Sequence, residues 1–323
     1  MSKNDAVLNG SLKDLSIWVY WHPFKGLIQK IPLRYLRHIH GVSDIIIPRA
    51  LPGKKRLMEG ELERVFGLRQ PGAEDIVKRT FSLLIQNELE VLLFPRLNPG
   101  NIGQFIEYSG LDNLDTALEG GRGVMLLFAH FGANQMVMPA IGYKGYRMSQ
   151  MSAPPTVWVE KMPEKKFSPM AKKALELRWE HELSLPVTHV NIFGSLKKAL
   201  MCLKSNEVLG IAMDGGGGTD KVRVDLLGKK ASLSTGAMKI AARSGCAVLP
   251  TFMVRGADRR HRIIIEKPLK ISGPGDEHEK VRRATACFAK RLEQYVVKYP
   301  CHYLNFLTLR KFMETQGEEP FLS

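Results

Sequence analysis

The chain has 323 residues, 44% of them hydrophobic, and 47 Lys and Arg against 32 Asp and Glu, which gives a formal net charge of +15. Its four scattered cysteines form no Cys-x-x-Cys pair, so neither a zinc nor a redox motif is expected. No run of 18 apolar residues is present and the first residues do not resemble a signal peptide, so no bilayer span is expected. The charge predicts an anionic partner, and because the basic residues are dispersed and no nucleic-acid-binding motif is present, a membrane surface or an acyl carrier fits better than nucleic acid.

The N-terminal segment combines aromatic and apolar residues from Ile17 to Ile39 with the cations Lys25, Lys30, Arg34 and Arg37. Trp and Tyr favour the headgroup boundary and cations attract anionic lipid, so this composition favours an interfacial anchor. Pro23 and Pro32 are expected to divide it into two or three short amphipathic pieces. The alternative is that the aromatic residues pack on the core, as apolar helical stripes usually do.

A long helix is predicted from Glu74 to Phe94, because apolar residues recur there at helical spacing, acids occupy the first turn and Pro95 follows. The apolar run Val124–Ala129, bounded by glycines, then predicts a buried strand with His130 at its carboxyl end. In open α/β sheets ligands bind at that end, and a neutral imidazole can remove a proton from a hydroxyl there. A helix beginning near Gln135 would add backbone N–H groups suited to a phosphate or a carbonyl oxygen.

A second strand, Val208–Met213, leads directly into Asp214 and four consecutive glycines that start at Gly215. The loop lacks both the P-loop and the dinucleotide-binding spacing, so it is either a headgroup-binding loop or a plain surface turn. A third strand, Ala247–Val254, ends at Arg255 and is expected to form a hairpin with Ile263–Ile265. An amphipathic helix near residues 281–296 closes the pattern.

These segments, in this order, resemble the acyltransferases of lipid A biosynthesis, particularly the lauroyl and myristoyl transferases, within the wider group of His-x4-acid glycerolipid acyltransferases. The likeness extends over roughly residues 60–312 and rests on the block from Gly123 to Gln135 together with Ile106–Tyr108, Gly110–Leu118, Leu209–Gly216, Val222–Gly228, Thr235–Ala241, Val248–Phe252, Lys298–Pro300 and Leu309–Lys311. The chain departs from the family pattern at Gln135, where the family has Glu or Asp. A glutamine oxygen can accept an N–H bond from His130 but supplies no charge.

The resemblance implies an α/β fold, a single domain with a mixed central sheet flanked by helices, plus an N-terminal amphipathic helical appendage. The expected boundaries are residues 1–56 for a membrane-interfacial segment, 57–312 for the acyltransferase domain and 313–323 for a C-terminal tail. It also implies a catalytic role for His130 and Gln135 and substrate binding by Asp214, Gly215, Lys221, Arg223 and Arg255. An alternative is that Asp214 already supports His130 from the adjacent strand end.

The implied activity is O-acyl transfer, with His130 as general base, from an acyl thioester on carrier protein or coenzyme A to a glycolipid or phospholipid hydroxyl. No metal or organic cofactor is expected, and the protein would lie peripherally or monotopically on the cytoplasmic face of a bacterial inner membrane. Two alternatives remain open: a non-catalytic membrane-bound adaptor that retains the fold, and a sugar-nucleotide transferase that uses Asp214 and Gly215.

Overall fold

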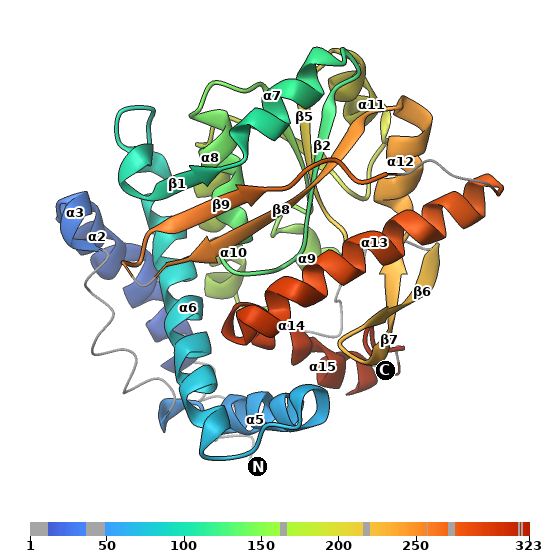
Figure 1. Ribbon diagram of the computed structural model, residues 1–323. Helices are drawn as coiled ribbons and strands as arrows, with labels where there is room; N and C mark the ends of the chain where they lie inside the picture. The colour runs from blue at the N-terminus through green and yellow to red at the C-terminus, as the bar shows by residue number, and fades with distance from the viewer. Residues whose placement is uncertain are drawn as a thin grey trace.

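The computed structural model describes residues 12–36, 49–161, 167–215, 220–256, 258–270, 275–315, 317 and 319–323. In this part of the chain the main sheet has seven strands in the order β1-β9-β8-β2-β5-β3-β4 (Figure 1). They are β1 (Ile106–Ser109), β2 (Val124–Phe128), β3 (Met148–Ser152), β4 (Thr188–Asn191), β5 (Val208–Ala212), β8 (Ala247–Arg255) and β9 (His261–Ile265). The predicted α/β domain with a mixed central sheet is confirmed.

The sheet is parallel from β8 to β4 and reverses at one edge. Strands β2, β3, β4, β5 and β8 pair in parallel, whereas β9 runs antiparallel to β8 and β1 runs parallel to β9. The predicted hairpin is therefore confirmed, with Arg255 opposite His261. The five parallel strands share one carboxyl edge, which is the edge where His130 and Asp214 follow their strands.

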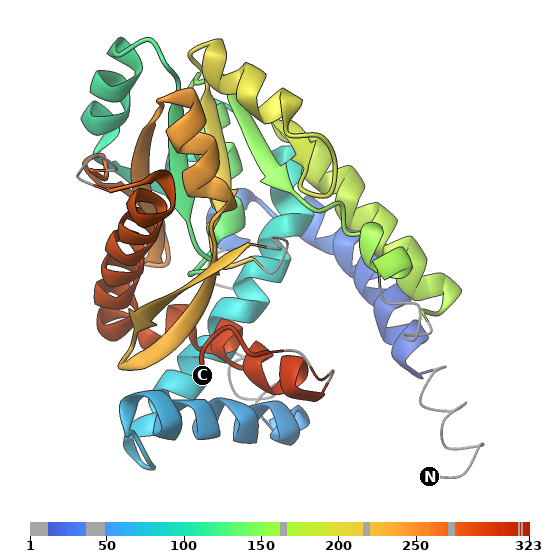
Figure 2. The ribbon, with the colours of Figure 1, turned by 90° about the vertical axis from the view of Figure 1, so that its right-hand side faces the viewer.

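Both faces of β2 are buried, which explains why this strand is a continuous apolar run. Met125 and Leu127 join a core with residues of α12 and α13, whereas Val124, Leu126 and Phe128 join a second core with residues of α8 and the N-terminal segment. Figure 2 shows α13 on one side of the sheet and α10 with the N-terminal helices on the other. The strand is thus held on both sides, and its carboxyl end is fixed in place.

Side-chain caps mark the start of two of the described helices. Asp276 accepts a hydrogen bond from the Glu279 N–H at the start of α13, and Ser168 accepts one from Ala171 at the start of α10. The helices are α2 (Lys25–Lys30), α3 (Leu33–Leu36), α5 (Pro52–Phe66), α6 (Gly72–Leu93), α7 (Leu111–Glu119), α8 (Val137–Gly142), α9 (Val157–Lys161), α10 (Pro169–Leu183), α11 (Lys197–Lys204), α12 (Gly236–Ser244), α13 (Glu277–Lys298), α14 (Leu304–Leu307) and α15 (Leu309–Thr315). The long helices predicted around residues 74–94 and 281–296 correspond to α6 and α13.

A separate two-stranded sheet, β6 (Lys221–Leu226) with β7 (Lys229–Ser234), packs its apolar face under α13. Its strands alternate buried and exposed residues, as expected for a sheet with one solvated face. The end of the chain adds to it, because Leu322 bridges Ala231 and is fully buried. Residues 319–323 therefore pack against the domain.

The N-terminal segment corrects the prediction for Pro23, whereas the predicted division at Pro32 is confirmed. Residues 12–30 are helical throughout, and Pro23 lies inside a π-helical turn, η1 (Tyr20–Phe24). The wider turn accommodates the proline ring and its missing N–H, so Pro23 does not break the helix. The helix ends instead at Ile31, whose extended backbone precedes Pro32.

The aromatic and apolar residues of the N-terminal helix divide between the core and the solvent. Trp21 and Ile28 are buried in the second core, and the Tyr20 hydroxyl donates to the Glu88 carbonyl on α6. On the other side of the helix, Leu15 and Trp18 are 55% and 47% exposed. Residues 37–48, which include part of the predicted anchor, lie outside the described residues. None of the described helices has the length and apolar character needed to cross a bilayer.

Candidate active site

Strand register brings His130 and Asp214 together. Phe128 of β2 pairs with Ala212 of β5, so the residues two positions beyond each strand lie side by side. Nδ1 of His130 lies 2.7 Å from Oδ1 of Asp214, and the His130 backbone N–H donates to both carboxylate oxygens at 3.1 and 2.9 Å. The pair therefore follows from the pairing of two parallel strands at their carboxyl ends.

The Asp214 carboxylate fixes the state of the imidazole. Its side chain is fully buried, whereas the His130 side chain is 44% exposed. An ionised carboxylate can only accept, so Nδ1 of His130 donates the proton and Nε2 of the neutral ring keeps its lone pair. Burial lowers the pKa of His130, but the charge and hydrogen bond of Asp214 raise it by more, so the pKa lies above its ordinary value of 6.5. The arrangement suits a base that acts near neutral pH.

Two aromatic residues from the C-terminal part complete the surroundings of the pair. The Tyr303 hydroxyl donates to Oδ2 of Asp214 at 2.9 Å, and the Phe306 ring stacks on the His130 ring with centroids 4.9 Å apart. Neither residue was predicted from the sequence. The sequence has no local signal for them, because the Tyr303–Asp214 bond joins residues 89 positions apart.

The loop after His130 is anchored by Gly132. Its φ of +62° is left-handed, and a Cβ there would lie 2.1 Å from the Met253 carbonyl oxygen, so this close approach requires glycine. The Gly132 N–H donates to the His302 carbonyl at 2.8 Å, and its carbonyl accepts from Asn87 at 3.0 Å. This N–H is thus already used within the protein.

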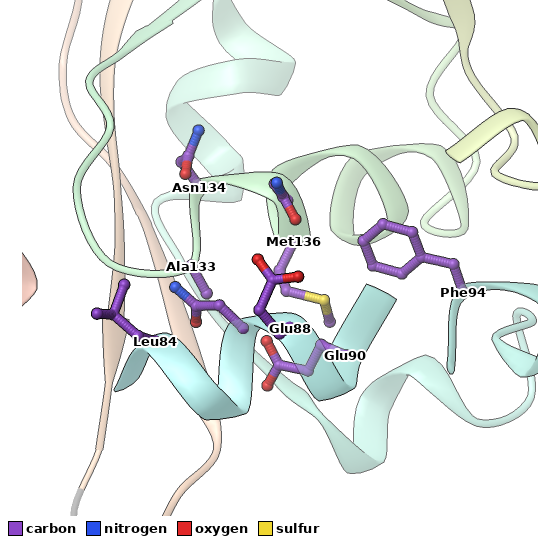
Figure 3. Close-up of a pocket in the computed structure, with 9 residues that line it drawn as sticks. Leu84, Glu88, Glu90, Phe94, Ala133, Asn134 and Met136 are labelled. Atoms are coloured by element: carbon purple, nitrogen blue, oxygen red, sulfur yellow. The ribbon is translucent and has the colours of Figure 1, made fainter. Parts of the chain in front are cut away.

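Gln135 lies apart from the pair. It belongs to the turn η5 (Asn134–Met136), which precedes α8, and among the described residues no hydrogen bond joins it to His130. It lines a cavity of about 100 Å³ between this turn and α6, formed by Leu84, Asn87, Glu88, Glu90, Phe94, Ala133, Asn134, Gln135 and Met136 (Figure 3). The carboxylate that contacts His130 therefore comes from Asp214 and not from the fifth position after the histidine, which is Gln135.

The other predicted site residues lie in three places: beside His130, on β6, and in a buried cluster that contains Arg255. Gly215 is adjacent to His130, since a Cβ on it would lie 3.7 Å from Cε1 of the ring. Lys221 and Arg223 are exposed on β6, where Arg223 pairs with Glu319 at 2.7 Å. Residues 216–219, the rest of the predicted glycine-rich loop, lie outside the described residues.

Arg255 belongs to a second, buried polar cluster that links α6 to the β8–β9 hairpin. Its guanidinium lies 2.7 Å from Glu90, which also contacts His261 at 2.7 Å, and its backbone N–H donates to Nε2 of His302 at 3.0 Å. Although burial raises the pKa of Glu90, the Arg255 guanidinium and the hydrogen-bonded His261 lower it to about 2. Burial and the charge of Arg255 lower the pKa of His302 to about 3, so His302 is a neutral acceptor. The guanidinium of Arg255 is thus engaged within the protein.

Among the described residues, no group of three His, Cys, Asp or Glu side chains is placed to hold a metal ion. The chemistry that the site offers is that of a carboxylate-supported imidazole beside an accessible surface, with a glycine next to the ring.

A comparison with family models gives an independent result. The model described as bacterial lipid A biosynthesis acyltransferase matches residues 10–312, which is nearly the whole chain and includes the N-terminal helix, His130, Asp214 and Tyr303. This match confirms the resemblance seen in the sequence blocks. No curated protein matches the chain.

Proposed function

We propose that this chain, which belongs to the bacterial lipid A biosynthesis acyltransferase family, moves a fatty acyl chain from a thioester to a hydroxyl of a glycolipid or phospholipid, with His130 as general base. The family establishes acyl transfer as the general activity. The observation that supports the base is the 2.7 Å contact between His130 and the buried Asp214 carboxylate.

In the proposed reaction, Nε2 of His130 removes the proton from the acceptor hydroxyl as its oxygen attacks the thioester carbonyl. The tetrahedral intermediate then collapses, the C–S bond breaks, and the thiolate takes the proton back from the imidazolium. Asp214 keeps the proton of the neutral ring on Nδ1 and stabilises the imidazolium in between. The step forms no acyl-enzyme.

Asp214 also bears on the adaptor alternative. That alternative rested on Gln135, which supplies no charge to a base. Because Asp214 places a carboxylate on His130, the substitution at Gln135 is not an argument against catalysis. The family match likewise favours acyl transfer over sugar-nucleotide transfer.

For partners and location we propose an anionic thioester donor, on carrier protein or coenzyme A, and peripheral binding to the cytoplasmic face of a bacterial inner membrane. The net charge of +15 suits both the donor and an anionic lipid surface. Leu15 and Trp18, exposed on the N-terminal helix, supply apolar groups that can enter the headgroup region.

The test is acyl transfer by the purified protein, with thioesters of both carriers and a set of glycolipid and phospholipid acceptors, followed by mass spectrometry of the lipids. His130→Ala is expected to lower transfer about 100-fold or more, which is the usual contribution of a positioned base, with an unchanged melting temperature. Equal turnover by the variant would exclude this mechanism. A folded, membrane-binding wild type that transfers nothing from any donor would favour the adaptor.

A further inference from the structure

The Asp214 carboxylate is enclosed by hydrogen-bond donors from two distant parts of the chain. Oδ1 faces Nδ1 of His130, while Oδ2 accepts from the His130 backbone N–H at 2.9 Å and from the Tyr303 hydroxyl at 2.9 Å. Tyr303 is itself fully buried. Its hydroxyl is thus the donor that comes from outside the strand-end loops, and it reaches the oxygen that His130 Nδ1 does not use.

We infer that Tyr303 is a positioning residue of the active site, which holds the Asp214 carboxylate in the orientation that accepts the Nδ1 proton of His130. The inference rests on the proposed function in so far as His130 is the base. Tyr303 acts through Asp214 and is not assigned a contact with substrate.

The carboxyl torsion of an aspartate is broad and roughly twofold, so hydrogen bonds to its oxygens decide which way it faces. The His130 backbone N–H lies within reach of both oxygens and does not by itself distinguish them. The Tyr303 hydroxyl contacts Oδ2 alone and therefore leaves Oδ1 for the imidazole. Burial and the neighbouring Asp214 raise the pKa of Tyr303 well above its ordinary value, so the hydroxyl stays protonated and remains a donor.

The backbone around Tyr303 is fixed in turn. The turn η6 (Pro300–His302) presents the His302 carbonyl to the Gly132 N–H, and the Tyr303 N–H donates to Pro300 at 3.1 Å. One turn further on, Phe306 stacks on the His130 ring with an interplanar angle of 6°. The segment from η6 to α14 therefore contacts His130, Asp214 and the loop that follows His130.

The test combines kinetics with the tautomer of His130, measured by 15N NMR of labelled protein at a pH where the ring is neutral. Tyr303→Phe keeps the ring and removes the hydroxyl. It is expected to shift part of the His130 population from the Nδ1–H to the Nε2–H tautomer and to lower kcat about tenfold, with less than twofold change in either KM. Asp214→Asn serves as the reference for a lost carboxylate.

Tyr146→Phe is the matched control, because the Tyr146 hydroxyl donates to Asp115 at 2.7 Å far from the site and its loss should change neither readout. If Tyr303→Phe does not fold, Tyr303→Met provides the same loss of hydroxyl with an adaptable side chain. An unchanged tautomer overturns the inference, whether or not kcat falls. A shifted tautomer supports it even if the wild type transfers no acyl chain, in which case the proposed function alone fails.

Discussion

His130 has a carboxylate partner that its motif position does not indicate. Gln135 follows the histidine at the spacing where the family has an acid, yet it lines a cavity against α6, and Asp214 occupies the place beside the ring. Burial lowers the pKa of His130, and the charge of Asp214 adds to the hydrogen bond in raising it, whereas a neutral glutamine would supply a hydrogen bond alone. The two candidate partners therefore make different predictions.

Replacing Asp214 by Asn should lower acyl transfer about 100-fold. It should also move the acid side of the profile of kcat/KM against pH to lower pH. The base works when neutral, so the wild-type rate should fall as pH decreases through a pKa above 6.5. Without the carboxylate the effect of burial is uncompensated, and the acid side of the profile should move below that value. The measurement is kcat/KM against pH for the two proteins.

Gln135→Ala and Gln135→Glu should each stay within about threefold of the wild-type rate, because neither change alters the partner of His130. If Gln135→Ala lost as much activity as Asp214→Asn, the supporting role would belong to Gln135. A clear gain from Gln135→Glu would likewise show that Asp214 alone does not supply the charge that the base needs.

At the scale of elements, the N-terminal helix has one face on the domain and another in solvent. Trp21 contacts the buried His181 edge-on with centroids 5.4 Å apart, and the Ile28 and Ile31 carbonyls accept from Arg96 at 3.0 and 2.9 Å. Removing the whole segment would therefore damage the core as well as any anchor. Substitutions on the exposed face separate the two roles.

The double substitution Leu15→Ser and Trp18→Ser should reduce binding to anionic vesicles tenfold or more, because it removes two apolar side chains that can enter the headgroup region. High salt should weaken wild-type binding by screening the cations. Vesicle sedimentation gives the measurement. Val297→Ser, at an exposed site on α13, is the control that should bind normally, and unchanged sedimentation of the double variant would place the anchor elsewhere.

At the scale of the whole molecule, the buried cluster of Glu90, Arg255, His261 and His302 joins α6 to the hairpin and to the turn that precedes Tyr303. These elements come from distant parts of the chain: α6 contributes Glu90, the hairpin contributes Arg255 and His261, and the turn contributes His302. The cluster therefore connects the stability of the domain to the geometry of the site.

Glu90→Gln should destabilise the protein by about 3–5 kcal/mol, because it leaves the buried Arg255 without its counter-charge. The pKa of Glu90 is lowered from 4.5 to about 2, so its contribution is complete above pH 4.5 and is lost as pH falls toward 2. Chemical unfolding at several pH values should show a smaller acid loss for the variant than for the wild type. Glu107→Gln, which breaks the exposed pair with Arg262, should change neither the stability nor its loss at acid pH. An equal effect of Glu90→Gln and Glu107→Gln would contradict this account.

Features that depend on local pattern could be predicted from the sequence. The apolar run before His130 predicted a buried strand, and apolar periodicity predicted the helices α6 and α13. The hairpin after Arg255 was predicted in the same way, because these patterns involve only residues that are near one another in the sequence. The ordered blocks also indicated the family. The prediction that Pro23 breaks the N-terminal helix was wrong, because a π-helical turn accommodates the proline ring.

Long-range packing determines which residues meet at the site. Asp214 was an open alternative until the register of β2 on β5 placed it beside His130, 84 positions away in the sequence. The same holds for Tyr303 and for the engagement of Arg255 by Glu90, because each contact joins elements whose relative placement depends on how the two cores pack on the sheet. A residue type and its neighbours indicate what chemistry is available, whereas the long-range packing fixes which groups supply it.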